Sequence, residues 1–319
     1  MNNELYFGLD IGRSDVKAQY GPDVNDVLIF PSYVARYRQR DLKSESQGLD
    51  NLEVTIDKET RFIGELARGM DGAREFGSNK AQHENTLFLM LTAIALAPTV
   101  RNLSVVYPRI VMGLPINNYT TQATEFERRV AGEYVVTLPG KRCTIVIDSA
   151  NVRAFQEGVG AFMDMALGSD GKPAREDLFQ RKLGFLDVGF KTVNFFVMDR
   201  GRFIDSQSGT LERLGMSDAY LAFYKRISRE KGVKPGEAEV LFNEGQGRKE
   251  IQELAIKLEG LLAPWWPDPR DFDIIYISGG GGIALKDYFV KYPVHLVPGS
   301  RTANASGFRK VALAKLGVK

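Results

Sequence analysis

The sequence predicts a mixed α/β protein made of two related domains, and three observations support this fold class. The chain has 319 residues, more than the commonest domain size. Strand-like hairpins alternate with helix-like segments, which is typical of mixed sheets rather than purely parallel ones. A unit of strand, Asp-x-Gly turn and strand at residues 7–21 recurs at 184–201, about half a chain later. In this repeat Asp10 matches Asp187, and Gly12 matches Gly189.

Apolar runs and their periodicity locate the individual elements. Strands are expected where Val, Ile, Leu and aromatic residues gather, at 5–9, 16–20, 105–112, 144–147, 185–186, 193–198 and 274–277. Helices are expected at 84–96, 121–130, 218–228, 249–262 and 307–316. The first helix places Leu87, Met90, Leu91 and Ile94 at helical spacing. Between 31 and about 52 the chain becomes polar and charged, which predicts an exposed loop.

Composition excludes several classes of function. A formal net charge of +2 gives no argument for direct nucleic-acid binding. The single cysteine, Cys143, lies in the apolar run CTIVID and cannot form an internal disulfide. Two histidines argue against His-rich metal sites and Ser-His-Asp hydrolysis. No signal-peptide pattern is recognised, and the apolar stretch 86–97 is too short to span a bilayer, so we expect a cytoplasmic chain without membrane contact.

The two Asp-x-Gly hairpins have the residue types of a phosphate and metal site. A carboxylate such as Asp10, within an apolar strand, is costly unless a cation meets it. Two glycine-containing turns that face each other can offer backbone N–H groups to one polyphosphate. Asp10 and Asp187 would then hold a divalent cation through its waters, as Mg²⁺ prefers, and Lys17 would reach back to a phosphate.

A glycine run provides a third candidate element. In IIYISGGGGIALKDYF a strand ends at Ser278, four glycines follow, and a helix comes next. Such a turn lets a ligand approach the backbone closely at a helix N-terminus, which favours anions. Taken alone, an Asp-x-Gly turn is most often an ordinary hairpin and a glycine run an ordinary turn. The stronger evidence for a phosphate-binding site is therefore that the three elements occur in this order.

That order resembles a known superfamily. Asp-x-Gly hairpin, VMGLPI, FQEGVGAF, Asp-x-Gly hairpin, ISGGGG and ANASGF follow one another as in the actin, sugar-kinase and DnaK ATPases. Within this superfamily the chain looks most like the compact prokaryotic actins of the ParM/StbA plasmid-segregation type and the archaeal actin homologues close to them. The resemblance implies an actin-like (ribonuclease H-like) fold, with mixed five-stranded-type sheets in two domains that flank a nucleotide cleft. It places domain I at 1–155 plus 302–319 and domain II at 156–301.

The resemblance also assigns roles to residues of this chain. Glu157 falls where the family places the residue that orients or activates the attacking water, with Gln156 as its nearest rival. Asp10 and Asp187 would be the metal-holding carboxylates. The expected nucleotide contacts are Asp10, Gly12, Arg13, Ser14 and Lys17 in the first phosphate loop, Asp187, Gly189, Phe190, Lys191 and Thr192 in the second, and Gly279, Gly280 and Gly281 in the adenosine motif.

The second loop departs from the family pattern. Phe190 and Lys191 stand where many relatives have small residues. Phe190 would hinder close backbone approach, whereas Lys191 would add positive charge near phosphate. Ribose contacts are expected from the helix at 249–262, with Glu253 and Lys257 as candidates, although a solvated helix face is the favoured interpretation of both.

The function that the resemblance implies is that of an actin-like ATPase. Such a protein binds ATP or ADP with Mg²⁺, polymerises head-to-tail with itself, and moves plasmid DNA through an adaptor protein bound to centromere-like DNA. A small-molecule kinase on the same fold is the main alternative, although such enzymes are usually longer and place an Asp base in the cleft. A cytoskeletal archaeal-type actin without a plasmid role is a third possibility.

Overall fold

The structure is a computed structural model that describes residues 4–39, 48–70, 72 and 80–317. The chain divides into two compact units, Met1–Ala174 with Asn304–Lys319, and Arg175–Ala303. The compact units divide at 174/175, whereas the domain boundary expected from the sequence, at 155/156, stays a prediction. Helix α4 (Val159–Ala166) packs within the first unit against α9 (Ala303–Leu316). Gly160 and Gly307 lie at this contact, where a Cβ on either glycine would meet backbone atoms of the other helix.

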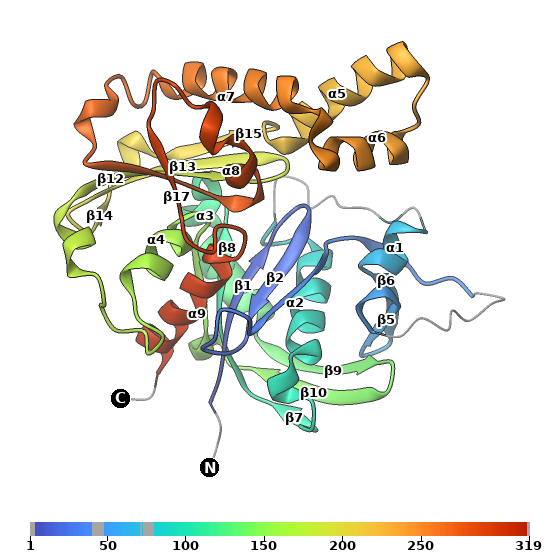
Figure 1. Ribbon diagram of the computed structural model, residues 1–319. Coiled ribbons are helices and arrows are strands. Elements are labelled where there is room, and N and C mark those ends of the chain that lie inside the picture. The colour runs from blue at the N-terminus through green and yellow to red at the C-terminus, as the bar shows by residue number, and fades with distance from the viewer. Residues whose placement is uncertain (1–3, 40–47, 71, 73–79, 318–319) are drawn as a thin grey trace. The chain divides into compact units, whose positions relative to one another are not determined.

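A five-stranded mixed sheet forms the centre of the first unit (Figure 1). Its strands, in spatial order, are β11 (Val152–Gln156), β8 (Pro108–Leu114), β1 (Leu5–Ile11), β2 (Asp15–Gln19) and β3 (Val27–Pro31). β1 pairs antiparallel with β2, and β2 with β3, whereas β8 runs parallel to both β1 and β11. This confirms the expected mixture of hairpins and crossovers.

A second sheet in the first unit was not foreseen. Its spatial order is β4 (Val34–Arg36), β6 (Glu59–Ile63), β5 (Leu52–Ile56), β9 (Gly132–Leu138), β10 (Lys141–Ile147) and β7 (Val105–Val106). The exposed loop expected from 31 to 52 is therefore wrong at Val34 and Ala35, which are buried in β4, while residues 40–47 lie outside the described part of the chain. The single strand expected at 105–112 is two strands, β7 and β8, in different sheets.

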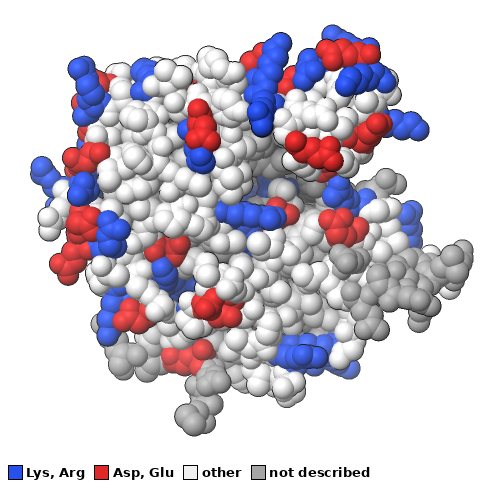
Figure 2. All heavy atoms as spheres, in the orientation of Figure 1, with Lys and Arg blue, Asp and Glu red and all other residues white. Residues whose placement is uncertain are grey.

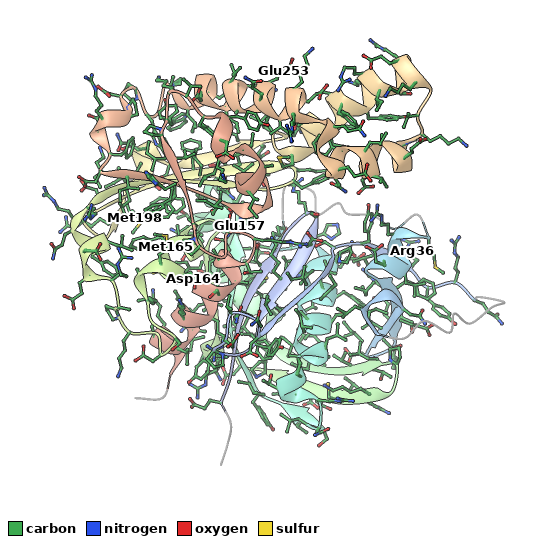
Figure 3. The ribbon with its side chains drawn as sticks, viewed as in Figure 1. Arg36, Glu157, Asp164, Met165, Met198 and Glu253 are labelled. Carbon is green, nitrogen blue, oxygen red and sulfur yellow. The ribbon has the colours of Figure 1, made fainter. Side chains whose placement is uncertain are left out.

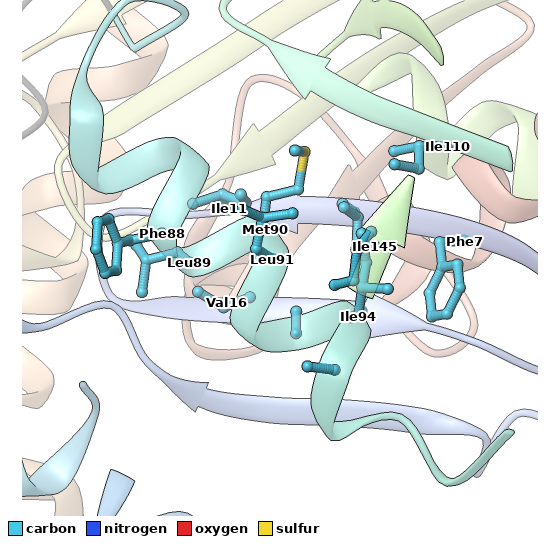
Figure 4. Close-up of a cluster of buried hydrophobic side chains, with 14 of the residues drawn as sticks. Phe7, Ile11, Val16, Phe88, Leu89, Met90, Leu91, Ile94, Ile110 and Ile145 are labelled. Atoms are coloured by element: carbon cyan, nitrogen blue, oxygen red, sulfur yellow. The ribbon is translucent and has the colours of Figure 1, made fainter. Parts of the chain in front are cut away.

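Helix α2 (Glu84–Leu96) fills the core of the first unit, together with α1 (Glu65–Arg68) and α3 (Tyr119–Val130) at its periphery. Figure 4 shows Leu89 and Ile94 of α2 in one buried cluster that also contains Val16 of β2 and Phe7 of β1. Because alternate strand residues point to opposite faces, Phe7 and Leu9 enter this core. Gly8 lies on the other face, close to α9, and Asp10 shares that face. The apolar strand thus keeps its carboxylate out of the apolar core.

The sheet of the second unit repeats the connectivity of the first. Its path is β14 (Arg202–Phe203), β13 (Thr192–Asp199), β12 (Lys182–Val188), β16 (Ile274–Ser278) and β17 (Val294–Leu296), with β15 (Gly209–Glu212) also paired to β13. β12 pairs antiparallel with β13 and parallel with β16, as β1 does with β2 and β8. The internal repeat expected from the two Asp-x-Gly stretches is therefore a repeat of topology.

Four α-helices lie in the described part of the second unit: α5 (Met216–Lys231), α6 (Pro235–Leu241), α7 (Arg248–Leu262) and α8 (Gly279–Leu285). Leu254 and Leu258 of α7 pack with Trp266 in the core of this unit. On the solvent side of α7, Glu253 is 59% exposed and Lys257 is exposed as well (Figure 3). Both side chains therefore lie on a solvated helix face.

The surface mixes charges of both signs. Figure 2 shows Lys and Arg side chains interspersed with Asp and Glu over the face that it displays. This agrees with the nearly balanced charge of the sequence. No helix in the described ranges has the length and apolar character needed to cross a bilayer.

Candidate functional site

The first Asp-x-Gly turn is a tight hairpin whose backbone carbonyl groups accept hydrogen bonds from other residues of the first unit. The Gly12 N–H donates to the Asp15 carbonyl at 3.0 Å. Ser32 binds the turn from the neighbouring strand end: its N–H donates to the Ser14 carbonyl at 2.9 Å, and its hydroxyl donates to the Gly12 carbonyl at 2.6 Å. Arg13 and Ser14, at the tip, are half-buried. The turn is thus held by Ser32, which lies in no motif that the sequence analysis singles out.

Asp10 meets a cation within the same hairpin. Asp10 and Lys17 are cross-strand partners in the β1–β2 register, and Lys17 Nζ lies 3.0 Å from Asp10 Oδ2. The two side chains are 10% and 15% exposed. Lys17, seven residues away, is therefore the cation that offsets the charge of Asp10. Its ammonium lies beside the carboxylate that we expect to hold a metal ion.

The second hairpin has the same turn and a different partner for its carboxylate. The Gly189 N–H donates to the Thr192 carbonyl at 2.9 Å, as in the first turn. The cross-strand partner of Asp187 is Asn194, and the hydroxyl of Ser278 on β16 donates to Asp187 Oδ1 at 3.1 Å. Ser278 was seen in the sequence only as the end of a strand.

The start of α5 holds the carbonyl groups of the second turn. The carbonyls of Gly189, Phe190 and Lys191 accept from backbone N–H groups at 3.1, 2.8 and 3.1 Å respectively. The donors are Met216, Ser217 and Leu214. Phe190 and Lys191 themselves are half-buried. In both hairpins, then, the carbonyl side of the turn is bound by another segment of the same unit.

The glycine run forms the first turn of α8 rather than a loop before it. Gly279 has φ of 83°, and a Cβ there would meet the Val188 carbonyl and lie 2.8 Å from Asp187 Oδ1. At Gly281 a Cβ would crowd Val188 and Met216. Gly280 differs, because a Cβ there would meet no atom within 4 Å. Two of the three glycines therefore permit close packing on β12, whereas Gly280 faces open space.

Glu157 and Gln156 lie at the carboxyl end of β11. Because β1, β8 and β11 run parallel, their carboxyl ends, with Asp10 and Gln156 among their residues, lie at one edge of the sheet. The Glu157 N–H donates to the Leu114 carbonyl at 2.8 Å and extends the ladder by one residue. The side chain of Glu157, labelled in Figure 3, forms an ion pair with Lys80 through its Oε1 atom. Lys80 was missed, because it is 77 residues away and no local pattern singles it out.

The carboxylates of the two hairpins suit a cation whose other ligands are waters and phosphates. Across the described ranges, no group of three or more His, Cys, Asp and Glu side chains is placed to hold a metal. Asp10 and Asp187 each offer one carboxylate at a sheet edge. Mg²⁺ usually keeps several waters and takes one or two carboxylates together with substrate phosphates. The residues present are compatible with that kind of coordination and not with an all-protein cage.

Two sheets that share one connectivity, each with an Asp-x-Gly hairpin, define the actin-like fold. In agreement, residues 8–160 match the family model for the N-terminal domain of actin-like proteins. No curated protein matches the sequence.

Solved structures match over nearly the whole chain. A ParM filament from Clostridium botulinum has a TM-score of 0.78 and 21% identity, covering 97% of this chain and 99% of that one. An archaeal actin homologue has a TM-score of 0.76 and 20% identity, with coverage of 97% and 98%. ParM from Bacillus thuringiensis with ATP has a TM-score of 0.72 and 16% identity, with coverage of 99% of both chains. The chain thus has the fold of these actin-like proteins.

Proposed function

We propose that this protein is an actin-like ATPase that binds ATP with Mg²⁺ and polymerises into filaments. The observation that carries the proposal is the duplicated hairpin, with a carboxylate at the end of each central strand and a glycine turn next to it. Two solved structures with this fold support it. The Bacillus thuringiensis ParM contains ATP, and the Clostridium botulinum ParM is a filament.

The phosphates are proposed to bind at the two turns. Ser32 and the start of α5 occupy the turn carbonyls, so an approaching anion would meet the amide side of each turn. Lys17 and Lys191 add positive charge there. Asp10 and Asp187 would hold Mg²⁺ through waters, and the bound ion would neutralise charge on the phosphates. Gly12, Arg13 and Ser14 belong to the first turn, and Gly189, Phe190 and Thr192 to the second.

The remaining contacts concern the water and the adenosine. Glu157 is proposed to orient the attacking water, with Gln156 as the alternative, so that catalysis depends mostly on positioning and charge. Gly279, Gly280 and Gly281 are proposed to lie along the adenosine. Gly280 is the position at which a ligand would come closest to the backbone without displacing protein atoms.

The biological role is proposed from the likeness to ParM. Head-to-tail contacts that do not close on themselves produce filaments. We propose that these filaments act in the cytoplasm to segregate plasmid DNA through an adaptor bound to centromere-like DNA. A cytoskeletal role without an adaptor is the alternative, and the presence or absence of a DNA-binding partner that co-pellets with the filaments separates the two.

Polymerisation tests the proposal directly. With Mg²⁺ and ATP the purified protein should scatter light above a critical concentration, pellet at high speed, and lose polymer as ATP becomes ADP. A coupling of ~1–3 kcal/mol between nucleotide state and subunit affinity would shift the critical concentration ~5–150-fold. Asp187→Ala should remove both nucleotide binding and scattering, whereas Asp287→Ala, at an exposed carboxylate, is the matched control. A protein that stays soluble in every nucleotide state, and whose ATP turnover a sugar stimulates, would be a small-molecule kinase instead.

A further inference from the structure

We propose that Lys80 is the positioning residue for Glu157 in ATP hydrolysis, an inference that rests on the proposed function. The two side chains form an ion pair through Lys80 Nζ and Glu157 Oε1. They are 8% and 13% exposed, so bulk solvent screens the pair only weakly. An ion pair whose two side chains are nearly buried fixes the orientation of the carboxylate more firmly than a solvent-exposed pair would.

The stem of Glu157 is already confined before Lys80 is considered. Its backbone N–H binds the Leu114 carbonyl at 2.8 Å, and Gly158, with φ of 84°, then turns the chain into α4. The side chain passes over Gly113, where an added Cβ would lie 3.1 Å from Glu157 Cγ. Backbone and stem are thus held by β8, and the carboxylate end is the part that Lys80 holds.

Lys80 is itself attached to rigid elements other than β8 and β11. The buried Thr86 of α2 donates its hydroxyl to the Lys80 carbonyl at 2.7 Å. Arg129 of α3 donates to the neighbouring Ala81 carbonyl at 3.2 Å. His83 then caps α2 by accepting the Asn85 N–H at 3.2 Å. The backbone at Lys80 is therefore held by α2 and α3, and the carboxylate end of Glu157 is bound by a residue that lies outside β8 and β11.

This arrangement assigns separate roles to the two residues. Glu157 faces the water, and Lys80 acts through Glu157 by keeping one carboxylate oxygen in place. A group that must orient a water has to be held in one geometry, because small misplacements reduce turnover strongly. Loss of Lys80 should therefore lower kcat with little effect on nucleotide affinity.

The test compares variants of the full chain in single-turnover hydrolysis and in binding of a fluorescent ATP analogue. Lys80→Met should lower kcat by ~10–100-fold, the usual effect of removing a group that orients a functional ligand. Nucleotide affinity should stay within a factor of ~2, and Lys80→Arg, which can still donate to the carboxylate, should retain more of the activity than Lys80→Met. In a Glu157→Gln background, Lys80→Met should add less than ~2-fold, because the two residues act as one unit.

Lys141→Met is the matched control. Lys141 is a half-buried lysine of the same unit whose Nζ donates to the Ala95 and Val100 carbonyls at 2.6 and 2.9 Å, so its loss should reduce stability and leave kcat unchanged. Should Lys80→Met not fold, Lys80→Gln replaces it, with folding checked by circular dichroism. Parallel losses of affinity and kcat, or an undiminished effect of Lys80→Met in the Glu157→Gln background, would overturn the inference. A wild-type chain that does not hydrolyse ATP would overturn the proposed function and the inference together.

Discussion

The hairpins of the two units share one backbone and differ in how they accommodate a carboxylate. Both turns close with a glycine N–H bonded to a carbonyl three residues on. Both place an aspartate at the end of a central strand, opposite a residue seven positions later. In the first unit that residue is Lys17, which pairs with Asp10, and in the second it is Asn194. Asp187 accepts a hydrogen bond from Ser278, on the neighbouring parallel strand.

This difference shows that the carboxylate position, and not its partner, is what the two units have in common. In the first unit, Lys17 of the same hairpin offsets the charge of Asp10 in an ion pair. In the second unit, the hydroxyl of Ser278 on another strand donates a neutral hydrogen bond to Asp187. Breaking a buried ion pair by removing one partner costs ~3–5 kcal/mol. Losing a neutral donor to a buried acceptor costs ~1–3 kcal/mol. The two units should therefore respond unequally to the same substitution.

The largest expected effect is that of Asp10→Asn on stability. It removes the charge that Lys17 pairs with and should cost about 3 kcal/mol, the lower end of the range for buried pairs, because Lys17 keeps some exposure. Asp187→Asn should cost about 1 kcal/mol, since Ser278 can still donate to the amide oxygen. Hydrogen exchange of β1 and β12 amides measures each unit separately. Equal losses in the two strands would contradict the comparison.

The same two variants also test the proposed metal site. Each should lower the affinity for ATP with Mg²⁺ by ~10–100-fold, as expected when a group that orients a metal's ligands is removed. Titration calorimetry with and without Mg²⁺ measures this. If only the Mg²⁺-dependent part of the affinity changes, both carboxylates act through the ion. If neither part changes, both are ordinary turn residues.

A smaller effect is expected from Ser278→Ala, which removes the hydroxyl that binds Asp187 Oδ1 at 3.1 Å. The cost should be ~1–3 kcal/mol. Both tryptophans of the chain, Trp265 and Trp266, belong to the second unit, so their fluorescence in urea follows that unit. Ser32→Ala, which removes a comparable hydroxyl from the first turn, is the control and should leave the fluorescence midpoint in place. An unchanged midpoint for Ser278→Ala would mean that Asn194 or water satisfies Asp187.

The smallest effect on stability is expected from Gly280→Ala. The added methyl group meets open space and should stabilise α8 by up to ~1 kcal/mol. Gly281→Ala is the opposing control, because its methyl group would crowd Val188 and Met216. Under the proposed function, Gly280→Ala should nevertheless weaken ATP binding in titration calorimetry. Unchanged affinity would limit the glycine run to packing α8 on β12.

Much of the fold was accessible from local patterns. The helix expected at 84–96 is α2 with the same bounds, because its apolar residues have helical spacing and it is buried on nearly all sides. The hairpins were recognised because a glycine turn separates two apolar strands. The second sheet of the first unit was missed. Its strand β4 lies within the stretch 31–52, whose polar residues predict a loop, and the short strand β5 pairs with β9 through residues about 80 positions away.

The residues of the candidate site likewise fall into those that a local motif predicts and those that only the tertiary structure reveals. Asp10, Asp187 and their glycines were found because each lies within a short, recognisable motif. Lys80 and Ser32 lie in no recognisable motif, and the sequence marks Ser278 only as the end of the strand before the glycine run. Each acquires its importance from a contact made across the fold.

By itself, then, the sequence determined the placement of each carboxylate. Alternation along β1 directs Phe7 and Leu9 into the core and leaves Asp10 on the opposite face, and a period of two residues requires no knowledge of the rest of the chain. Only the tertiary structure decided which groups meet these carboxylates. Glu157 and Lys80 are 77 residues apart, and Asp187 and Ser278 are 91 apart. Such pairs form only when parallel strands and packed helices bring distant segments together, and side-chain patterns with periods of two or 3.6 residues carry no information at that range.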